Sequence, residues 1–430
     1  MKLHLLTPVI VLATAILPAA ASAAPLAVRL VAGPVGGRLD SRAVKARLGD
    51  PVRVCAMIQL GSGRRARFFA DPDVVYINGR RLRGRRLLPT RALAREAGSQ
   101  TARNLVWRWY RVEPRPHHVD TPPPNEGNPA YSNATLFGAS HGKWLGYDQI
   151  EYHETLIVGQ SGSCITVDRT HPTHPKVDVN GGLGTMRYKA SVTLDGGVPC
   201  LSCTRGTHSG GGPPPRVLSS PGMESRGRTG ISAAVLRVTF RSADTLTGHL
   251  RGFFNVPNVF GSGGYGRRHQ TELYQGADCA DVIIGAAREG GARLAYTSVL
   301  GFRRHARPTT GKLLMTREGM FHADGPERGR AVKLRFGEEV HPGDIMLIDY
   351  AGFDGSPRSW DHIAVVDRDR GVRGQLDPQD PVLHMGYLFG LTEEPAATQA
   401  PAVIQLLRFR PSILRAIGRR RSMHRGQAVR

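Results

Sequence analysis

The stretch Gly276-Ala-Asp-Cys-Ala-Asp-Val-Ile-Ile-Gly-Ala-Ala-Arg-Glu-Gly290 predicts a short helix with a cysteine in its first turn. Asp278 is a good N-cap residue, and Asp281 supplies the acidic group favoured in a first turn. Gly290 and Gly291 provide a left-handed stop after the last turn. Apolar residues recur at helical spacing, so one face of the helix should be buried in a core. These residues are Ala280, Ile283, Ile284 and Ala287.

Cys279 would stand at the positive end of this helix. Unpaired backbone N–H groups at a helix start favour a thiolate over a thiol, and they can also stabilise an oxyanion. The position therefore suits a nucleophile. The alternative interpretation is a small buried cysteine without chemical function, which is the commoner case for a single cysteine.

The first 23 residues predict a secretory signal peptide. Met1-Lys2 gives a positive start, Leu5 to Leu17 is an apolar run too short to span a bilayer comfortably, and Ala21-Ser-Ala23 supplies small residues before a cleavage site. No later apolar run approaches transmembrane length. We therefore expect an exported protein, periplasmic or extracellular, without a transmembrane segment.

The chain has 430 residues, enough for two or three domains, and a formal net charge of +23. The excess arginine is spread along the whole sequence and favours polyanionic partners. In an exported protein these are acidic envelope polymers such as peptidoglycan, or anionic lipid headgroups, and not nucleic acid. A composition that reflects solubility or genome bias is the alternative explanation.

The cysteine count is odd, which bears on a protein expected in an oxidising compartment. One of the three possible pairings of four cysteines joins Cys55 to Cys164 and leaves the Cys-x-x-Cys pair to bond to itself. Cys279 is then left over as the candidate nucleophile. A zinc site formed by the Cys-x-x-Cys pair and His208 is a weaker alternative. The five cysteines are Cys55, Cys164, Cys200, Cys203 and Cys279.

Alternating apolar residues and turn signals predict a β-rich region over residues 24–205, with a possible role in binding the envelope. Val52 to Leu60 alternates along one strand, and Val74 to Ile77 runs into Asn78-Gly79, a strong hairpin signal. Another strand alternates apolar residues with Arg187, Lys189 and Ser191, which predicts one polar face. Strands of this kind favour an antiparallel β-sandwich, of which the immunoglobulin-like fold is one form.

Residues 206–230 are rich in Gly, Pro and Ser and predict a linker. Residues 231–410 then mix helix and strand signals, with strands expected at 345–348, 363–366 and 403–409. We expect this part to form an α+β domain. Residues 411–430 begin with a short amphipathic piece and become an arginine-rich tail, which we expect to contact anionic surfaces.

A cysteine nucleophile needs a base, and histidine has a suitable pKa. His362 is the candidate because it opens a strand that should be buried on both sides. A third polar group should fix the tautomer of that ring. His384 is the first choice, with Asp380 and Asp367 in reserve. A cysteine on a helix followed by polar residues on two successive strands is the order that a papain-like half-barrel requires.

Four segments, taken in order, resemble the NlpC-type cell-wall cysteine peptidases and, more distantly, the CHAP amidases. The family motifs are Gly-x-Pro-Tyr-x-Trp-Gly-Gly, Asp-Cys-Ser, Pro-Gly-Asp and His-Val-Gly-Ile-Tyr. The resemblance extends from Ser242 to about Phe409 and implies a papain-like fold for the C-terminal half. The corresponding segments are Asn255-Val-Pro-Asn-Val-Phe-Gly-Ser262, Asp278-Cys279-Ala280, Pro342-Gly343-Asp344 and Asp361-His362-Ile-Ala-Val-Val.

The resemblance implies that Cys279 is the nucleophile, His362 the base and His384 the group that orients the base, with no metal or organic cofactor. Asn258 stands where the family usually has a tyrosine near the active site, and Asn258 and Asp278 are the candidate substrate contacts. The implied activity is thiol-dependent hydrolysis of a peptidoglycan amide bond, by an endopeptidase or an amidase. The alternative is an envelope-binding or scaffold protein whose papain-like domain is inactive.

Overall fold

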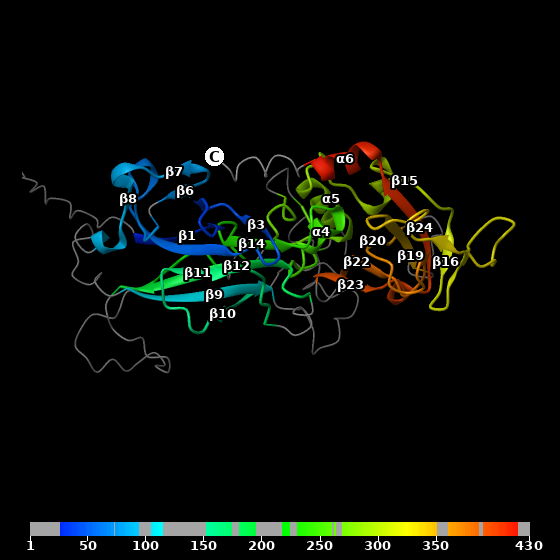
Figure 1. Ribbon diagram of the computed structural model, residues 1–430, viewed down its shortest axis with the longest axis horizontal. Helices are drawn as coiled ribbons and strands as arrows, with labels where there is room; N and C mark the ends of the chain where they lie inside the picture. Colours follow the sequence, from blue (N-terminus) through cyan, green and yellow to red (C-terminus); the bar gives the residue numbers. More distant parts are fainter. Residues whose placement is uncertain are drawn as a thin grey trace, which may run out of the picture.

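The computed structural model describes residues 26–72, 74–93, 105–114, 152–173, 180–194, 217–223, 230–259, 262–263, 269–350, 360–386 and 390–419. The expected signal peptide, the Cys-x-x-Cys pair with His208, and residues 420–430 of the basic tail lie outside these ranges. Within them the chain is β-rich and folds into several sheets. Figure 1 shows an N-terminal set of strands and a C-terminal set, with helices between them.

The first N-terminal sheet contains the predicted hairpin at Asn78-Gly79. Both residues adopt the left-handed conformation that a tight hairpin turn requires, with φ of 49° and 82°. The sheet also carries a disulfide between Cys55 and Cys164, which are register partners on neighbouring strands. In spatial order the strands are β7 (Arg80–Arg81), β6 (Val75–Ile77), β2 (Leu39–Asp40), β1 (Leu26–Pro34), β4 (Val52–Leu60), β5 (Arg67–Phe69) and β8 (Leu87–Leu88), with β11 (Cys164–Val167) on β4. Short 3-10 turns η1 (Gly63–Arg65), η2 (Gly84–Arg86) and η3 (Thr90–Ala92) connect them.

The second N-terminal sheet packs against the first around one shared apolar core, which includes Val54, Ile58, Trp109, Tyr188 and Val238. Its strands in spatial order are β10 (Tyr152–Leu156), β9 (Val106–Pro114), β12 (Gly184–Thr193), β14 (Leu236–Arg241) and β3 (Val44–Arg47), with β13 (Val217–Ser219) on β12.

Two of these strands move the expected boundaries. β13 lies inside the segment expected to be a linker, and β14 lies inside the expected C-terminal domain. Both pair with β12, and β14 contributes Val238 and Phe240 to the N-terminal core. The N-terminal unit therefore extends to Arg241, because its long central strand β12 pairs with strands that lie far along the chain.

The C-terminal unit is built on one antiparallel sheet that contains the three strands expected there. The stretch between Cys279 and His362 adds β15 to β18, which extend the edge of this sheet or form a small second one. The main order is β17 (Met320–His322), β16 (Leu313–Met315), β24 (Ala402–Phe409), β19 (Ile345–Tyr350), β20 (His362–Val366), β22 (Pro381–Gly386) and β23 (Gly390–Pro395), with β15 (Ala306–Pro308) on β24. β18 (Leu334–Arg335) pairs with β21 (Gln375–Leu376), and η8 (Val299–Arg304) and η9 (Ala396–Gln399) are 3-10 turns.

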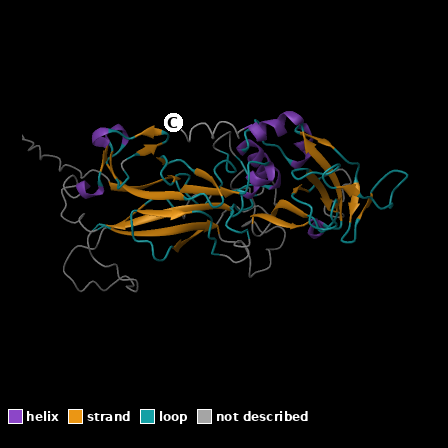
Figure 2. Ribbon diagram, in the orientation of Figure 1, coloured by secondary structure: helices purple, strands orange, loops and turns teal. Residues whose placement is uncertain are grey.

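Three helices, α4 (Leu246–Arg251), α5 (Cys279–Glu289) and α6 (Pro411–Arg419), gather near the junction of the two units, as Figure 2 shows. α6 corrects the expected boundary of the basic tail. Its Ile417 is buried, and a Cβ added to Gly290 would lie 2.7 Å from a methyl carbon of that side chain. Residues 411–419 therefore form a helix docked on the end of α5, and glycine at position 290 allows the close approach.

The central strands of the C-terminal sheet are buried on both faces. On β20, Ile363 and Val365 join the core that contains α5, whereas Ala364 and Val366 join the core on the other side. His362 shares the face of Ala364 because side chains alternate along a strand. This alternation decides how the candidate catalytic residues are arranged.

The polar face expected on β12 is not a solvent-facing surface. Arg187 is fully buried at the junction, where it donates to the carbonyl oxygens of Asn255, at 3.0 Å, and of Tyr274. Arg237 stands opposite it on β14 and donates to the carbonyl of Leu273. The outer face of the second sheet therefore contacts the turns that precede α5.

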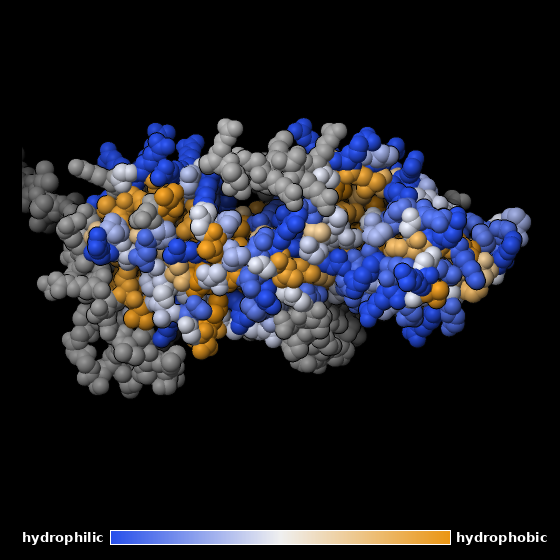
Figure 3. All heavy atoms as spheres, viewed as in Figure 1, coloured by the Kyte–Doolittle hydropathy of each residue, from blue (hydrophilic) through white to orange (hydrophobic). Residues whose placement is uncertain are grey.

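The surface of the C-terminal unit is mainly hydrophilic on the face drawn in Figure 3, as the large excess of arginine leads one to expect. In the described part of the chain, none of the helices has the length and apolar character needed to cross a bilayer.

Candidate active site

Cys279 is the first residue of α5, as predicted. The side chain of Asp278 caps the helix, and its Oδ1 accepts a hydrogen bond of 2.7 Å from the backbone N–H of Asp281. The predicted apolar face is buried in the core between α5 and the sheet. Cys279 carries a free thiol that is half-buried against this core.

The helix start favours a thiolate at Cys279, as expected, but burial outweighs this effect. Burial raises the pKa of the thiol, and the negative charge of Asp278 raises it further; Asp281 adds to this effect only when it is ionised. The backbone N–H groups of Ala280 and Cys279 act in the opposite direction but do not outweigh these effects. Cys279 is therefore a neutral thiol at rest.

A buried polar network that the sequence did not reveal supports the start of α5. Ser262 donates a hydrogen bond of 2.5 Å to Asp281 Oδ2 and accepts one of 3.3 Å from the N–H of Asp278. His269 Nε2 lies 3.6 Å from the same carboxyl oxygen, and its ring stacks on Tyr296. The position of Ser262 in the NlpC-like segment was a signal that this residue lies near α5.

Both titratable members of this network have shifted pKa values. Burial, reinforced by the charge of Asp278, raises the pKa of Asp281 to about 8. Burial lowers the pKa of His269 to about 4. At neutral pH the pair is therefore largely an uncharged carboxylic acid beside an uncharged imidazole.

His362 and His384 lie in contact. His362 Nε2 is 3.0 Å from His384 Nδ1, and the ring planes are perpendicular. The register of β20 and β22 places Ala364 opposite His384, so both histidines share one face of the sheet. Burial, together with the neighbouring His384, lowers the pKa of His362 to about 3. His362 is therefore a neutral imidazole that can accept a proton.

The two reserve carboxylates have other roles. Asp380 is fully buried and accepts hydrogen bonds from the backbone N–H groups of Arg370 and Gly371, so it holds a loop. Asp367 forms ion pairs with Arg251 and Arg368. Neither carboxylate bonds to His362 within the described ranges, and His384 occupies the place of the third polar group.

Three further side chains surround the outer nitrogen of His384. His384 Nε2 lies 3.2 Å from Gln399 Nε2, 3.3 Å from Thr392 Oγ1 and 3.5 Å from Glu394 Oε2. Sequence reasoning missed all three. The available signal was the alternation of Thr392 and Glu394 on β23, since Thr392 is the register partner of His384.

Tyr350, at the end of β19, connects the cysteine and the histidines. Its ring stacks on His362 with centroids 6.2 Å apart, and its hydroxyl donates to Gln399 Oε1. After burial, a negative charge on Cys279 is the next largest cause that raises the pKa of Tyr350. Tyr350 therefore lies within electrostatic reach of the sulfur and against the imidazole.

The helix that begins at Cys279 and the ring of His362 lie on opposite faces of the C-terminal sheet. α5 packs on the face of Ile363 and Val365, whereas His362 lies on the opposite face. Cys279 is the first residue of its helix and His362 the first residue of its strand, and Tyr350 lies against the His362 ring. Among the described residues Cys279 makes no hydrogen bond to either histidine.

The two candidate substrate contacts differ in position. Asn258 is half-buried and forms a parallel bridge with Ala277, so it lies beside the segment that leads into Cys279. Asp278 uses a carboxylate oxygen to cap α5. In this structure Asp278 is thus a helix-capping residue, whereas Asn258 remains positioned next to the nucleophile's segment.

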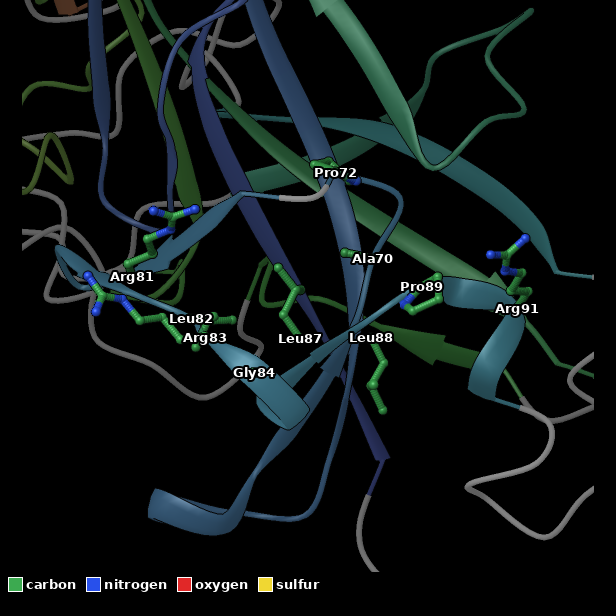
Figure 4. Close-up of a pocket in the computed structure, with 10 residues that line it drawn as sticks. All are labelled: Ala70, Pro72, Arg81, Leu82, Arg83, Gly84, Leu87, Leu88, Pro89 and Arg91. Carbon is green, nitrogen blue, oxygen red and sulfur yellow. The ribbon is translucent and has the colours of Figure 1, made fainter.

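A separate pocket of about 500 Å³ lies on the first N-terminal sheet. Figure 4 shows Arg81 and Arg83 on one side of it and Arg91 on the other, with leucines between them. In the part of the chain that the structure describes, these three guanidinium groups have no hydrogen-bond or ion-pair partner. The apolar residues that line the pocket are Leu82, Leu87, Leu88, Pro72 and Pro89.

Across the described ranges, no three His, Cys, Asp or Glu side chains are grouped so that they could hold a metal ion. Comparisons with protein-family models, with curated proteins and with solved structures found no match. Any assignment of function therefore depends on the residues and their geometry.

Proposed function

We propose that this protein is an exported, thiol-dependent amide hydrolase that acts on a peptide bond of peptidoglycan, with a papain-like C-terminal domain and an N-terminal β-sandwich. The observation that carries the proposal is the hydrogen bond of 3.0 Å between His362 and His384, on two strands against which α5, the helix that begins at the free thiol of Cys279, packs. Thiol hydrolysis requires a nucleophile, a base and a group that orients the base, and these three residues are the candidates for those roles.

In the proposed reaction Cys279 Sγ attacks the carbonyl carbon while His362 takes the thiol proton. His362 Nε2 is engaged with His384, so Nδ1 is the nitrogen that accepts the proton. The backbone N–H groups that approach the sulfur, those of Cys279 and Ala280, are placed to stabilise the oxyanion. The proton passes to the leaving amine as the C–N bond breaks.

The acyl-enzyme is then hydrolysed. A water molecule gives a proton to His362 and attacks the thioester carbonyl, and the bond from carbon to Cys279 Sγ breaks. The sulfur recovers its proton from His362, and a carboxylic acid product leaves. Because the resting thiol and imidazole are both neutral, proton transfer accompanies each attack and no ion pair exists beforehand.

The proposed substrate is an envelope polymer because its carboxylates would match the positive charge of the protein. The pocket bordered by Arg81, Arg83 and Arg91 supports this choice, since unpaired guanidinium groups bind carboxylates well. The N-terminal unit would then hold the polymer while the C-terminal unit cuts its peptides.

The direct test is digestion of purified peptidoglycan by the wild-type protein and by Cys279→Ala and His362→Ala variants. Both substitutions should abolish release of soluble fragments, and His322→Ala, at a partly exposed histidine, should leave it unchanged. A Cys279→Ala protein that digests peptidoglycan as well as wild type would overturn the proposal.

A second candidate function, an inactive envelope-binding or scaffold protein, is favoured by the raised pKa of Cys279. The two candidates differ in the reactivity of the thiol. In a hydrolase, His362 assists deprotonation, so alkylation of Cys279 at neutral pH should become slower in a His362→Ala variant. In a scaffold, the same substitution should not change the alkylation rate.

A further inference from the structure

The hydrogen bond between the two histidines restricts where their protons can be. In the state in which both imidazoles are neutral, each carries one proton, and His362 Nε2 and His384 Nδ1 share a single hydrogen bond, so one of them donates and the other accepts. If His384 donates, His362 carries its own proton on Nδ1. In that arrangement the nitrogen left for Cys279 is already protonated and cannot act as a base.

The productive arrangement is the opposite one. His362 then donates from Nε2 to His384 Nδ1, which leaves Nδ1 of His362 free to accept the thiol proton. His384 must in turn carry its proton on Nε2. The tautomer of His384 therefore decides whether His362 can work, and the groups that face His384 Nε2 decide that tautomer.

Glu394 favours a proton at this position. A carboxylate can accept a hydrogen bond but cannot donate one, and Glu394 Oε2 lies 3.5 Å from His384 Nε2. Hydrogen bonding from His384 is the main cause that lowers the pKa of Glu394, so this group stays ionised at neutral pH. Thr392 Oγ1, at 3.3 Å, can accept from the same nitrogen.

Gln399 acts against this arrangement. Its amide nitrogen lies 3.2 Å from His384 Nε2 and can only donate, which favours the tautomer of His384 without a proton on Nε2. The hydroxyl of Tyr350 holds this amide by donating to Gln399 Oε1. Rotation of the amide by half a turn would present oxygen to His384 instead. A charge-assisted bond to a carboxylate is about twice as strong as a neutral one, so Glu394 should prevail.

We infer that Glu394 is a positioning residue that keeps the proton of His384 on Nε2 and thereby leaves Nδ1 of His362 free to act as the base. The series of proton-sharing groups would then run from Cys279 through both histidines to Glu394. The catalytic consequence rests on the proposed hydrolase function, whereas the tautomer itself does not.

The tautomers can be identified by NMR of the full-length protein labelled with ¹⁵N-histidine. Protonated and unprotonated ring nitrogens have distinct ¹⁵N chemical shifts. His362→Gln and His384→Gln variants would assign the signals. In the wild-type protein at neutral pH both rings should be protonated on Nε2. In Glu394→Met, with Gln399 as the remaining strong influence, both should become protonated on Nδ1.

Two control variants test the reasoning. Glu393 precedes Glu394 on β23 and pairs with Arg251 and Arg368, so Glu393→Met should leave both tautomers unchanged. Gln399→Met removes the opposing donor and should also retain the wild-type pattern. A wild-type His362 protonated on Nδ1, or a Glu394→Met spectrum with the wild-type tautomers, would overturn the inference.

The activity measurement separates the inference from the proposed function. Glu394→Met should lower kcat/KM for peptidoglycan fragments by a factor on the order of 10², and Glu393→Met should have little effect. If the tautomers shift as expected but the wild-type protein hydrolyses nothing, the hydrolase proposal fails and the role of Glu394 in fixing the tautomer stands. If the wild type is active and Glu394→Met retains full kcat/KM, the positioning role is refuted.

Discussion

Arg187, on a strand of the N-terminal unit, donates a hydrogen bond to the carbonyl oxygen of Tyr274, which lies shortly before Cys279. It also donates to the carbonyl of Asn255 at 3.0 Å. Tyr274 and Asn255 both adopt left-handed backbone conformations, with φ of 52° and 63°. Such a conformation costs on the order of 1–3 kcal/mol for residues other than glycine and persists where surrounding contacts impose it. One buried guanidinium thus secures two strained turns of the C-terminal unit.

We therefore predict that Arg187→Met destabilises the protein. Two buried carbonyl oxygens would lose their donors, and each loss costs about 1–3 kcal/mol. Removal of a buried cation offsets part of this cost. The free energy of unfolding, measured in urea, should fall by about 2–3 kcal/mol. Arg53→Met, at an exposed position of β4, is the matched control and should change it little. Equal unfolding midpoints for the two variants would contradict the role assigned to Arg187.

The pH dependence of hydrolysis follows from the uncharged resting states of Cys279 and His362. His362 acts as a base in its unprotonated form, and its pKa is lowered to about 3, so the base is lost when the pH falls through that value. We predict that kcat/KM is nearly constant from about pH 5 to about pH 8 and falls only below about pH 4. Circular dichroism at each pH would separate this fall from acid unfolding. An acid limb near the ordinary histidine pKa of about 6.5 would show that His362 is not buried as described.

Local patterns were sufficient to predict the elements that carry the candidate catalytic residues. The N-cap Asp278, the spacing of the apolar residues and the terminal glycines specify α5 within a single short stretch. β20, which carries His362, could be predicted because a strand buried on both faces appears as a continuous apolar run, and the same pattern predicted β24 in the same sheet. Each of these features depends on residues close together in the sequence.

Relationships between distant segments could not be predicted in this way. Nothing in the sequence around β14 indicates that it pairs with β12 and not with the C-terminal sheet. The polar pattern of β12 is the same whether Arg187 faces water or a second unit. Glu394 and Gln399 reach His384 through hairpin register and a 3-10 turn, and neither is near His384 in any recognisable motif.

The pocket on the N-terminal sheet leads to a prediction about polymer binding. Replacing Arg81, Arg83 and Arg91 together by glutamine removes three positive charges from its border that have no partner among the described residues. Co-sedimentation with insoluble peptidoglycan should weaken by about tenfold, and the residual binding should depend less on salt. The control removes the same charge from exposed arginines of the C-terminal unit, namely Arg307, Arg317 and Arg328. Equal loss in both triple variants would mean that net charge, and not this pocket, is responsible.

Asp281 gives a prediction about stability and pH. Its pKa is raised from 3.8 to about 8, so between these values the folded protein keeps a proton that the unfolded chain has released. The folded state then binds more protons, and the stability that Asp281 contributes is present in full below about pH 4 and is lost as the pH rises through 8. Asp281→Asn mimics the protonated form, keeps an oxygen that can accept from Ser262 and does not titrate.

The stability of Asp281→Asn relative to wild type should therefore increase with pH. We expect the difference in free energy of unfolding to grow by at least about 1 kcal/mol between about pH 5 and about pH 8, since each unit of pKa shift corresponds to about 1.4 kcal/mol. At neutral pH Asp281 is mostly protonated, so the substitution should change alkylation of Cys279 little there; above about pH 8, where the wild-type carboxylate is ionised and raises the pKa of the thiol, the variant should be alkylated faster. Glu338→Gln, at an exposed carboxylate, should show neither effect. A stability difference that is the same at all pH values would mean that Asp281 is already ionised at pH 5, and that Ser262 and His269 hold a carboxylate.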